Sequence, residues 1–258
     1  MHAAHTHLMK LDHELITVMD LAEPLVSFDQ DAPTSAVKAF MKKNGFDVVG
    51  VRREGRVAGY ARYNDLDDGP LVTPINEFQE GDVLPSAASL YDAFETIAQN
   101  RRIFVEILGQ VGAIATRADL RKLPVRLWLF GIVTLTEIEM TRLLRKYHPT
   151  DKTLECLLSE GRLDAAQKIY NLYQKKGEEL KLLDCLQFCD KAQLIVKTPE
   201  IWNSLNFSSK GKFEELFQKL EGKRDQLAHG HDFVPHDATS LFTLVKQSKQ
   251  VLERFKAL

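Results

Sequence analysis

One stretch of sequence occurs twice and decides the fold of the N-terminal half. Residues 35–66 read SAVKAFMKKNGFDVVGVRREGRVAGYARYNDL, and residues 89–120 read SLYDAFETIAQNRRIFVEILGQVGAIATRADL. Aligned without a gap, nine of the 32 positions are identical, against about two expected by chance. The identities are Ser35/Ser89, Ala39/Ala93, Phe40/Phe94, Val51/Val105, Gly55/Gly109, Val57/Val111, Ala61/Ala115, Asp65/Asp119 and Leu66/Leu120. The sequence therefore predicts a duplicated unit.

Each copy shows the same order of local patterns. A helix is predicted to begin at Ser35 or Ser89, because apolar residues follow at helical spacing, and two short strands come next. The predicted strands and the turn glycine between them are 47–52, 57–61 and Gly55 in the first copy, and 102–108, 111–115 and Gly109 in the second. A short helix is predicted near Asp65 or Asp119. The two small sheets are expected to bury their apolar faces together.

These residues, with Val18-Met19-Asp20 ahead of the first copy, resemble the CBS family, whose modules come in pairs and often bind adenine-containing nucleotides. The resemblance covers about residues 15–122. It implies that Thr116 and Asp119 hold phosphate and ribose, and that Ile103 and Phe104 contribute to the same nucleotide site. A hydroxyl can donate to a phosphate oxygen, and a carboxylate can accept from ribose hydroxyls. The ligand implied is AMP, ADP or ATP.

The first copy departs from this pattern. Asp65 is kept, but Arg62 stands where the second copy has Thr116. Arg62 either contacts phosphate or marks a lost site, so the second copy is expected to be the better nucleotide site. A different interpretation stays open, since the spacing of Thr116 and Asp119 also suits a helix cap. Paired modules can also serve only in dimerisation.

The bulk composition describes an ordinary globular protein. Hydrophobic residues make up 44% and charged residues 27% of 258 residues, which is long for one core and comfortable for two. The net charge of −2 gives no general attraction to nucleic acid or anionic membranes, so any site for a polyanion must be local. The longest apolar run, 125–135, is shorter than the ~20 residues that span a bilayer. We therefore expect neither a DNA partner nor a membrane segment.

The cysteines and histidines give weaker indications of the cellular compartment and of metal binding. The three cysteines, Cys156, Cys185 and Cys189, suggest a reducing compartment and hence a cytoplasmic protein. The helical spacing of Cys185 and Cys189 could serve a metal, but no second pair of ligands is near in the sequence, so core packing is favoured. Residues 1–14 are predicted to be a flexible tail, although their histidines could bind a metal. These histidines are His2, His5, His7 and His13.

The pattern changes to helical periodicity after Pro124, so the fold class predicted is α+β. Repeats at about 15–68 and 69–122 are followed by an all-α bundle over about 125–258. Helices are predicted at 125–147, 151–160, 163–176, 178–197, 211–229 and 238–256. Breaks are predicted at Pro149, Gly161, Gly177, Pro199 and Pro235.

An arginine interrupts the apolar stripe of the fifth predicted helix. Arg224 lies seven residues after Phe217 and four after Leu220, on the stripe that includes Phe213, Leu216 and Leu227. A charge on a buried stripe is costly unless it is paired or lines a cleft. Asp225 and His229 follow it, and Gly230 can end the helix.

The segment Arg224-Asp225-Gln226-Leu227-Ala228-His229 resembles the arginine–histidine motif of HEPN domains, many of which are metal-independent endoribonucleases that dimerise. The resemblance implies that His229 exchanges a proton with the RNA 2′-hydroxyl or the leaving oxygen, that Arg224 stabilises the phosphorane-like charge, and that Asp225 orients them. No cofactor is implied for catalysis. Arg142 and His148 form a second pair with similar spacing, but Leu143 follows that arginine.

Two alternatives concern this helix. Arg224 could pair with a buried carboxylate, Glu137 or Glu139, while His229 caps the helix end. Lys212, Lys219 and Lys223 share a neighbouring face and either attract a phosphate backbone or are simply solvated.

The sequence leads to two hypotheses of function. The first is a homodimeric endoribonuclease controlled by an adenine nucleotide bound to the repeat. The second is a non-catalytic nucleotide-sensing or dimerisation protein whose helical part binds a partner. Nucleotidyl transfer, or the action of a toxin that an antitoxin neutralises, cannot be separated from the first by sequence.

Overall fold

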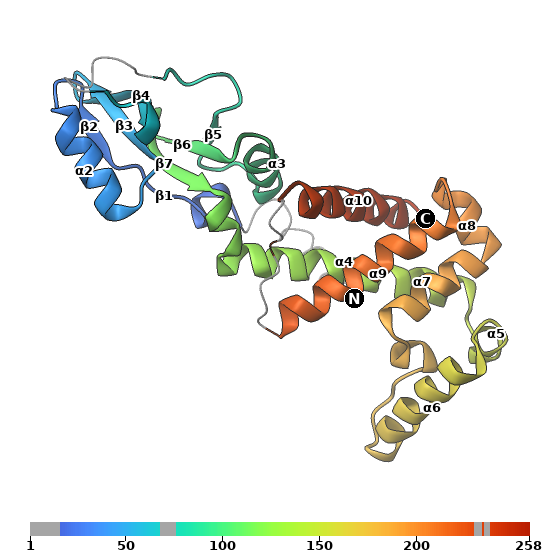
Figure 1. Cartoon of the computed structure of the whole chain (residues 1–258). Helices are drawn as coiled ribbons and strands as arrows, with labels where there is room; N and C mark the ends of the chain where they lie inside the picture. Colours follow the sequence, from blue (N-terminus) through green and yellow to red (C-terminus); the bar gives the residue numbers. More distant parts are fainter. Residues whose placement is uncertain (1–15, 68–75, 230–233, 235–237) are drawn as a thin grey trace. The chain divides into compact units, whose positions relative to one another are not determined.

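The computed structural model describes residues 16–67, 76–229, 234 and 238–258. The chain forms two compact units, Met1–Val125 (unit 1) and Arg126–Leu258 (unit 2). Unit 1 contains two β-sheets with helices and unit 2 is helical, so the predicted α+β class is confirmed (Figure 1). The N-terminal histidines and Pro235 lie outside the described residues.

Unit 1 repeats one order of elements: strand, helix, hairpin and a 3₁₀ turn. Ahead of the first copy lie η1 (Val18–Asp20) and β1 (Glu23–Pro24). The first copy contains β2 (Ser27–Asp29), α2 (Thr34–Asn44), β3 (Val48–Arg53), β4 (Arg56–Arg62) and η2 (Tyr63–Asp65). The second contains β5 (Val83–Pro85), α3 (Leu90–Asn100), β6 (Arg102–Ile107), β7 (Gln110–Thr116) and η3 (Arg117–Arg121). The predicted hairpins are present, but the sequence pattern missed β2 and β5.

The segment that precedes each copy pairs with the sheet of the other copy. One sheet has the order β2-β3-β4, and the other has the order β1-β7-β6-β5. β1, which precedes the first copy, pairs antiparallel with β7 of the second copy, with Glu23 opposite Ile114. Asn76, which precedes the second copy, forms a bridge with Tyr60 of the first. The predicted repeat boundaries near residue 68 therefore cut across the sheets.

The helix starts and the hairpin turns are explained by local features, namely N-cap residues and positive φ angles. Ser89 is the N-cap of α3, as predicted, since its hydroxyl accepts the Asp92 N–H at 3.2 Å. Ser35 lies one residue inside α2, whose N-cap position is Pro33. Both hairpin tips have two residues with positive φ, the arrangement of a type I′ turn. These pairs are Glu54–Gly55 (49° and 77°) and Leu108–Gly109 (51° and 76°).

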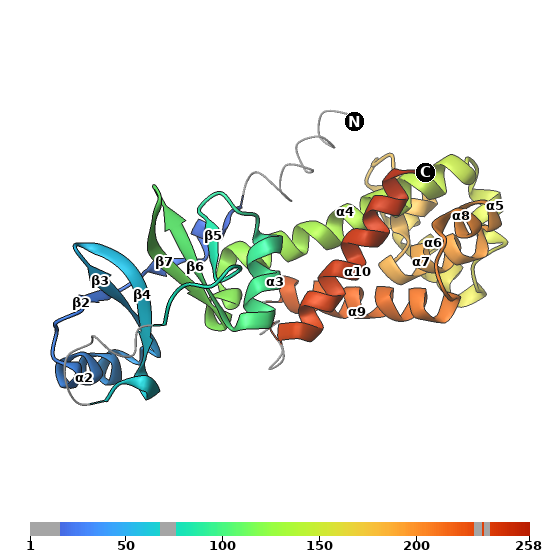
Figure 2. The same cartoon turned by 90° about the horizontal axis from the view of Figure 1, so that it is seen from above.

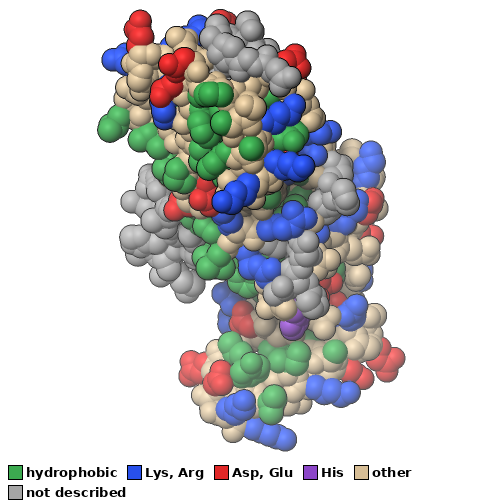
Figure 3. Space-filling model, turned by 60° about the vertical axis from the view of Figure 1, so that its left-hand side comes forward, with side chains coloured by type: hydrophobic (Ala, Val, Ile, Leu, Met, Phe, Trp, Pro, Cys, Tyr) green, Lys and Arg blue, Asp and Glu red, His purple; other side chains and the backbone are tan. Residues whose placement is uncertain are grey.

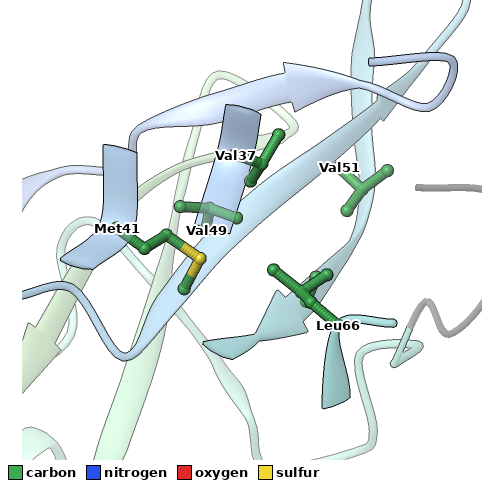
Figure 4. Packing of buried hydrophobic residues seen from close by; sticks show 6 residues of the cluster. Val37, Met41, Val49, Val51 and Leu66 are labelled. Carbon is green, nitrogen blue, oxygen red and sulfur yellow. The ribbon is translucent and has the colours of Figure 1, made fainter. Parts of the chain in front are cut away.

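Each sheet has two covered faces, and Figure 2 shows the two sheets between α2 and α3. Val37 and Met41 of α2 pack on Val49 and Val51 of β3, with Leu66 closing the cluster (Figure 4). Between the sheets, one cluster joins residues of both copies: Leu25, Val48, Tyr60 and Phe104. Fully burying such an apolar side chain contributes about 1.5–3 kcal/mol. The expected burial of the two apolar faces against each other is thus confirmed.

Unit 2 is built from helices of very different length. They are α4 (Leu123–Tyr147), α5 (Asp151–Glu155), α6 (Glu160–Lys175), η4 (Leu182–Cys185), α7 (Phe188–Lys197), α8 (Pro199–Leu205), α9 (Lys210–Ala228) and α10 (Ala238–Lys256). The long helices α4, α9 and α10 match the prediction within two residues. α4 and α9 are joined by a hydrogen bond from Arg126 Nη1 to the Leu227 carbonyl at 2.7 Å.

Three predictions in the middle of unit 2 were wrong. Residues 178–187 are not one helix with α7, because only Leu182–Cys185 form a 3₁₀ turn (η4), Leu186 after it is extended, and α7 begins at Phe188. Gly161 does not break the chain but lies in the first turn of α6. No helix was predicted over 199–205, although the predicted break at Pro199 is present, since α7 ends at Lys197. Pro199 is the first residue of α8, where its missing N–H has no helical partner to lose.

Two helices of unit 2, α4 and α6, expose large apolar side chains, which on α4 include Leu127, Phe130 and Ile138. α6 buries Ala166, whereas Ile169 and Leu172 are exposed. The space-filling view shows hydrophobic side chains on this helix, the lowest in that view (Figure 3). Among the described residues, no helix combines the length and the hydrophobicity that a membrane span requires.

Candidate functional site

The inner faces of the two hairpins place polar residues beside the core between the sheets. Tyr60 and Phe104 belong to that core. Alternate residues of a strand point to the same face, so Arg62 and Arg102, two residues from Tyr60 and Phe104, share it. Thr116 lies directly opposite Arg102 in the hairpin register and shares its face. The fold thus brings together the ends of β4 and β7 and the start of β6.

Two arginines from different copies converge on one tyrosine. Nη2 of Arg62 donates a hydrogen bond to the Tyr60 hydroxyl oxygen at 3.1 Å, and its guanidinium carbon lies 5.6 Å from the ring centroid. The guanidinium carbon of Arg102 lies 6.0 Å from the same centroid. Both are within the distance of cation–π attraction. The hydrogen bond to Tyr60 raises the pKa of Arg62, and the charges of Asp65 and Asp82 raise it further.

Arg102 carries a buried donor. Its Nη1 is inaccessible to solvent and has no hydrogen-bond partner among the residues that the structure describes. Buried donors in proteins are nearly always satisfied, so a group of this kind is where an anionic ligand would be held. Sequence reasoning missed Arg102 and Tyr60. The signal lay in the alignment of the two copies, where Arg102 replaces the apolar Val48.

Asp65 lies at the rim of the same region. Asn76 Nδ2 approaches its Oδ2 at 3.5 Å, and the Asn76 backbone pairs with that of Tyr60 at 2.8 and 3.0 Å. The 3₁₀ turn η2 has no side-chain cap, because Arg62 occupies the N-cap position. The carboxylate of Asp65 is therefore not used in capping and can accept hydrogen bonds from another group.

Thr116 and Asp119 are arranged differently. Oδ2 of Asp119 accepts the Thr116 backbone N–H at 2.7 Å and the Thr116 hydroxyl at 2.9 Å, which makes a capping box for η3. Oδ1 lies 2.9 Å from Lys122 Nζ, and Lys122 also binds Glu23. Burial lowers the pKa of Lys122, but its hydrogen bonds to Glu23 and Asp119 raise it above the ordinary value. Asp119 is thus engaged within the fold, as the capping interpretation expects.

The same capping geometry occurs at η1. Thr17 donates its backbone N–H to Asp20 Oδ2 at 2.7 Å, and the Thr17 hydroxyl lies 3.4 Å from that oxygen. The threonine–aspartate spacing is therefore used as a cap twice in this unit. Ile103 and Phe104, the other residues assigned to the nucleotide site, are 0% and 1% exposed. Their side chains belong to the core, so only their backbone could face a ligand.

Arg224 is less buried than its position on the apolar stripe suggested. Phe213, Leu216, Phe217, Leu220 and Leu227 are buried as predicted. The Arg224 side chain is 32% exposed, and its Nη2 lies 3.1 Å from Asp225 Oδ1. Its guanidinium carbon lies 6.0 Å from the Phe188 ring centroid. His229 is exposed at the C-cap of α9, where its backbone N–H donates to the Asp225 carbonyl.

The carboxylates suggested as partners of Arg224 are engaged elsewhere. Glu137 accepts from Lys191 at 2.7 Å, and Glu139, which is 1% exposed, pairs with Arg142 at 2.7 Å. That alternative for Arg224 was therefore wrong. The pair Arg142 and His148 is structural, since Arg142 also donates to the Phe255 carbonyl at 2.6 Å. His148 Nε2 lies 2.7 Å from the Thr198 hydroxyl.

The cysteines show no sign of a metal site. Cys185 is buried, and burial together with a hydrogen bond to Glu221 raises the pKa of Cys189 to about 12. A thiol is a poor metal ligand until it is deprotonated. Among the described residues, no group of three or more histidine, cysteine or acidic side chains could hold a metal ion.

Comparisons with known proteins give only distant likenesses. No family model matches the chain, and no curated protein is significantly similar to it. Among solved structures, a CBS domain-containing protein of unknown function from Bacillus anthracis is 16% identical, with 44% of this chain and 96% of that chain covered and a TM-score of 0.38. A hemolysin-like CBS protein of Oenococcus oeni is 14% identical, with 45% and 93% covered and a TM-score of 0.35.

A third structure is the CBS domain of a bacterial CNNM/CorC family Mg²⁺ transporter in complex with ATP. It is 15% identical to this chain, with 46% of this chain and 93% of that chain covered and a TM-score of 0.36. At these identities and scores, the likenesses assign neither a ligand nor an activity to this protein.

Proposed function

We propose that unit 1 is a CBS-type pair that senses an adenine nucleotide, held by its phosphate between the two hairpins. The observation that carries the proposal is the convergence of Arg62 and Arg102, one from each copy, on Tyr60. The buried Nη1 of Arg102, which has no hydrogen-bond partner among the described residues, supports it. Two guanidinium groups that approach the same ring are stabilised when an anion lies between them.

The other polar groups of this face suit the rest of a nucleotide. The rigid donor forks of the two arginines match phosphate oxygens. Asp65, which caps no helix, can accept hydrogen bonds from ribose hydroxyls. The Thr116 hydroxyl faces the same side of the sheet as Arg102, and because it donates to Asp119 it can offer a ligand only an acceptor. Adenine as the base is implied by the resemblance to CBS modules. Because the arginines come from different copies, binding would stabilise the pairing of the two sheets.

Calorimetric titration of the full chain with AMP, ADP and ATP tests this proposal. Binding should be present in the unmodified protein and should weaken by at least about tenfold in Arg102→Ala, since hydrogen bonds to charged groups contribute about 1.5–3 kcal/mol. Arg56→Ala is the matched control, because Arg56 is an exposed arginine at the other end of β4. Equal affinities of Arg102→Ala and the control would contradict the site.

We also propose a second function, RNA cleavage without a metal by Arg224, Asp225 and His229 of unit 2. The supporting observation is that Arg224 is partly exposed and is held by Asp225, while Arg142 of the similar pair is engaged with Glu139 and Phe255. Attack by the 2′-hydroxyl would expel the 5′-oxygen and leave a 2′,3′-cyclic phosphate. His229 would take the proton from the hydroxyl or give one to the leaving oxygen.

If this second function is correct, the protein cleaves RNA in the presence of EDTA. It does not cleave DNA of the same sequence, because DNA lacks the 2′-hydroxyl. His229→Ala and Arg224→Ala should abolish RNA cleavage, with the exposed Arg53→Ala as the control. We expect a homodimer, because one arginine–histidine set forms half of the cleft in the family that this segment resembles. Light scattering tests the dimer, and unchanged cleavage by His229→Ala would reject the catalytic assignment.

A further inference from the structure

A groove of about 520 Å³ opens at the N-terminal end of α9 in unit 2. Its floor and walls come from the loop between α8 and α9, from the first half of α9 and from the second half of α10. A volume of this size is typical of a small-molecule site. Its lining includes Phe207, Lys212, Lys219, Gln247, Gln250 and Arg254.

Positive charge predominates in this groove. Lys212, Lys219 and Arg254 line it together with one acidic residue, Glu215. Glu215 pairs with Lys219 at 2.7 Å, and this lysine, followed by Lys212, lowers its pKa. The groove therefore keeps two positive charges that no lining carboxylate balances, and it favours an anion.

Arg254 is fixed in place but keeps donors free. Nη1 donates to the carbonyl oxygens of Leu205 and Asn206 at 3.0 and 3.1 Å. The guanidinium carbon lies 5.6 Å from the centroid of the Phe207 ring. Among the described residues, its Nε and Nη2 have no hydrogen-bond partner. A guanidinium held by one nitrogen presents the other two as a preorganised fork for phosphate oxygens.

The remaining lining suits the other parts of a nucleotide. Phe207 and Leu216 give an apolar wall, against which a flat ring can stack. Gln247 and Gln250, three residues apart on α10, offer amide donors and acceptors on the same side of that helix. α9 begins at Lys210, and its N-terminal N–H groups add to the positive potential.

From this combination of cations, amides and an aromatic wall, we infer that the groove binds a nucleotide, with its phosphate on Lys212 and Arg254 and its base between Phe207 and the two glutamines. The ligand is either a free nucleotide or one nucleotide of an RNA strand. The site is separate from the one proposed for unit 1, because every lining residue belongs to unit 2.

Tryptophan fluorescence reports on this site directly. The chain has two tryptophans, and the ring centroid of Trp202 lies 6.4 Å from that of Phe207. Arg62→Ala/Arg102→Ala protein, in which the proposed unit 1 site is disabled, is titrated with uridine monophosphate, inorganic phosphate and single-stranded oligouridylate. We expect the nucleotides to change the fluorescence, and Trp202→Phe to remove the change. Tighter binding of the oligonucleotide than of the mononucleotide identifies a strand as the ligand, and equal binding identifies the free nucleotide.

Lys212→Ala/Arg254→Ala should weaken binding at least about tenfold. Lys168→Ala/Lys246→Ala, which removes two exposed charges outside the groove lining, should not. Because Arg254 also holds the α8–α9 loop, a second variant, Gln247→Glu/Gln250→Glu, adds negative charge without removing a structural contact and should also prevent binding. The proposal is overturned if no ligand changes the Trp202 signal, if both groove variants bind like the unmodified groove, or if inorganic phosphate binds as tightly as the nucleotide. Each of these results leaves the proposal for unit 1 intact.

Discussion

Both copies of the repeat end in a 3₁₀ turn, η2 or η3, but the side chains of the two turns interact differently. In the second copy, Thr116 and Asp119 satisfy each other, and Lys122 neutralises the carboxylate. In the first copy, Arg62 replaces the threonine, so η2 has no side-chain cap and Asp65 is not engaged in one. The copy that keeps the threonine–aspartate pair therefore uses it to stabilise the fold, whereas the copy that lost the threonine has polar groups available to a ligand.

The arginine–histidine pairs of unit 2 show the same contrast. Arg142 and His148 hold buried groups of their own unit, namely Glu139, the Phe255 carbonyl and Thr198. Among the described residues, the ion pair and the cation–π contact of Arg224 are with its neighbour Asp225 and with the ring of Phe188. In both units a spacing motif occurs twice, and the hydrogen bonds of each occurrence distinguish a structural role from an available one.

Among the substitutions that test this contrast, Arg142→Ala should cause the largest loss of stability. Arg142→Ala removes the ion-pair partner of Glu139, which is 1% exposed, and a hydrogen bond to Phe255. Because breaking a buried pair costs about 3–5 kcal/mol and Arg142 is itself partly exposed, we expect a loss of about 2–3 kcal/mol. Arg224→Ala should cost less than about 1 kcal/mol. Urea denaturation followed by tryptophan fluorescence measures both, and equal losses would contradict the distinction between the pairs.

The next largest effect should be a difference in stability between Asp119→Ala and Asp65→Ala, the two aspartate substitutions in the repeat. Asp119→Ala removes both hydrogen bonds of a capping box and the partner of Lys122, so it should lower the free energy of unfolding by about 1–2 kcal/mol. Asp65→Ala removes no cap and should cost less than about 0.5 kcal/mol. Thermal denaturation of the two variants makes the comparison. A larger loss for Asp65→Ala would show that the capping interpretation is mistaken.

Much of this fold could be predicted from the repeat alone, because the duplicated pattern fixed the hairpins, the helix between strands and the burial of one face of each sheet. The strands β2 and β5 could not be predicted, since three residues are too few to show alternation. The exchange of β1 and Asn76 between the sheets could not be predicted either. It depends on pairing between segments far apart in sequence, which local patterns do not encode.

In the candidate sites too, motif positions could be predicted from the sequence, whereas tertiary contacts could not. Thr116, Asp119, Arg62 and Asp65 could be found as motif positions, but whether a side chain is available depends on tertiary partners such as Lys122. Arg102 was missed because it belongs to no motif and matters only through its approach to Tyr60. Ile103 and Phe104 were placed at the site, although their strand positions bury both side chains.

Converting the first copy to the chemistry of the second should have a smaller effect than the losses above. Arg62→Thr recreates the threonine–aspartate spacing, so the new hydroxyl can cap η2 and engage Asp65. We expect nucleotide affinity to fall about five- to tenfold, which corresponds to about 1–1.4 kcal/mol, while thermal stability is unchanged or slightly higher. Thr116→Ser, which keeps the hydroxyl, is the control. Unchanged affinity of Arg62→Thr in calorimetry would locate the phosphate away from Arg62.

The smallest effect should be a pH dependence that marks His148 as structural. Burial lowers its pKa from the ordinary value of 6.5, although the charge of Glu200 opposes this. The unfolded chain then binds more protons than the folded protein, so stability falls as the pH drops through about 6.5 and levels off below the lowered value. Since His148 is partly exposed, we expect a loss of less than about 0.5 kcal/mol between pH 7.5 and 5. His148→Gln should remove this component from the stability–pH curve, and His229→Gln controls for the loss of an imidazole at the surface. A curve that His148→Gln leaves unchanged would show that the imidazole titrates equally in both states, and that its contact with Thr198 does not restrict its protonation.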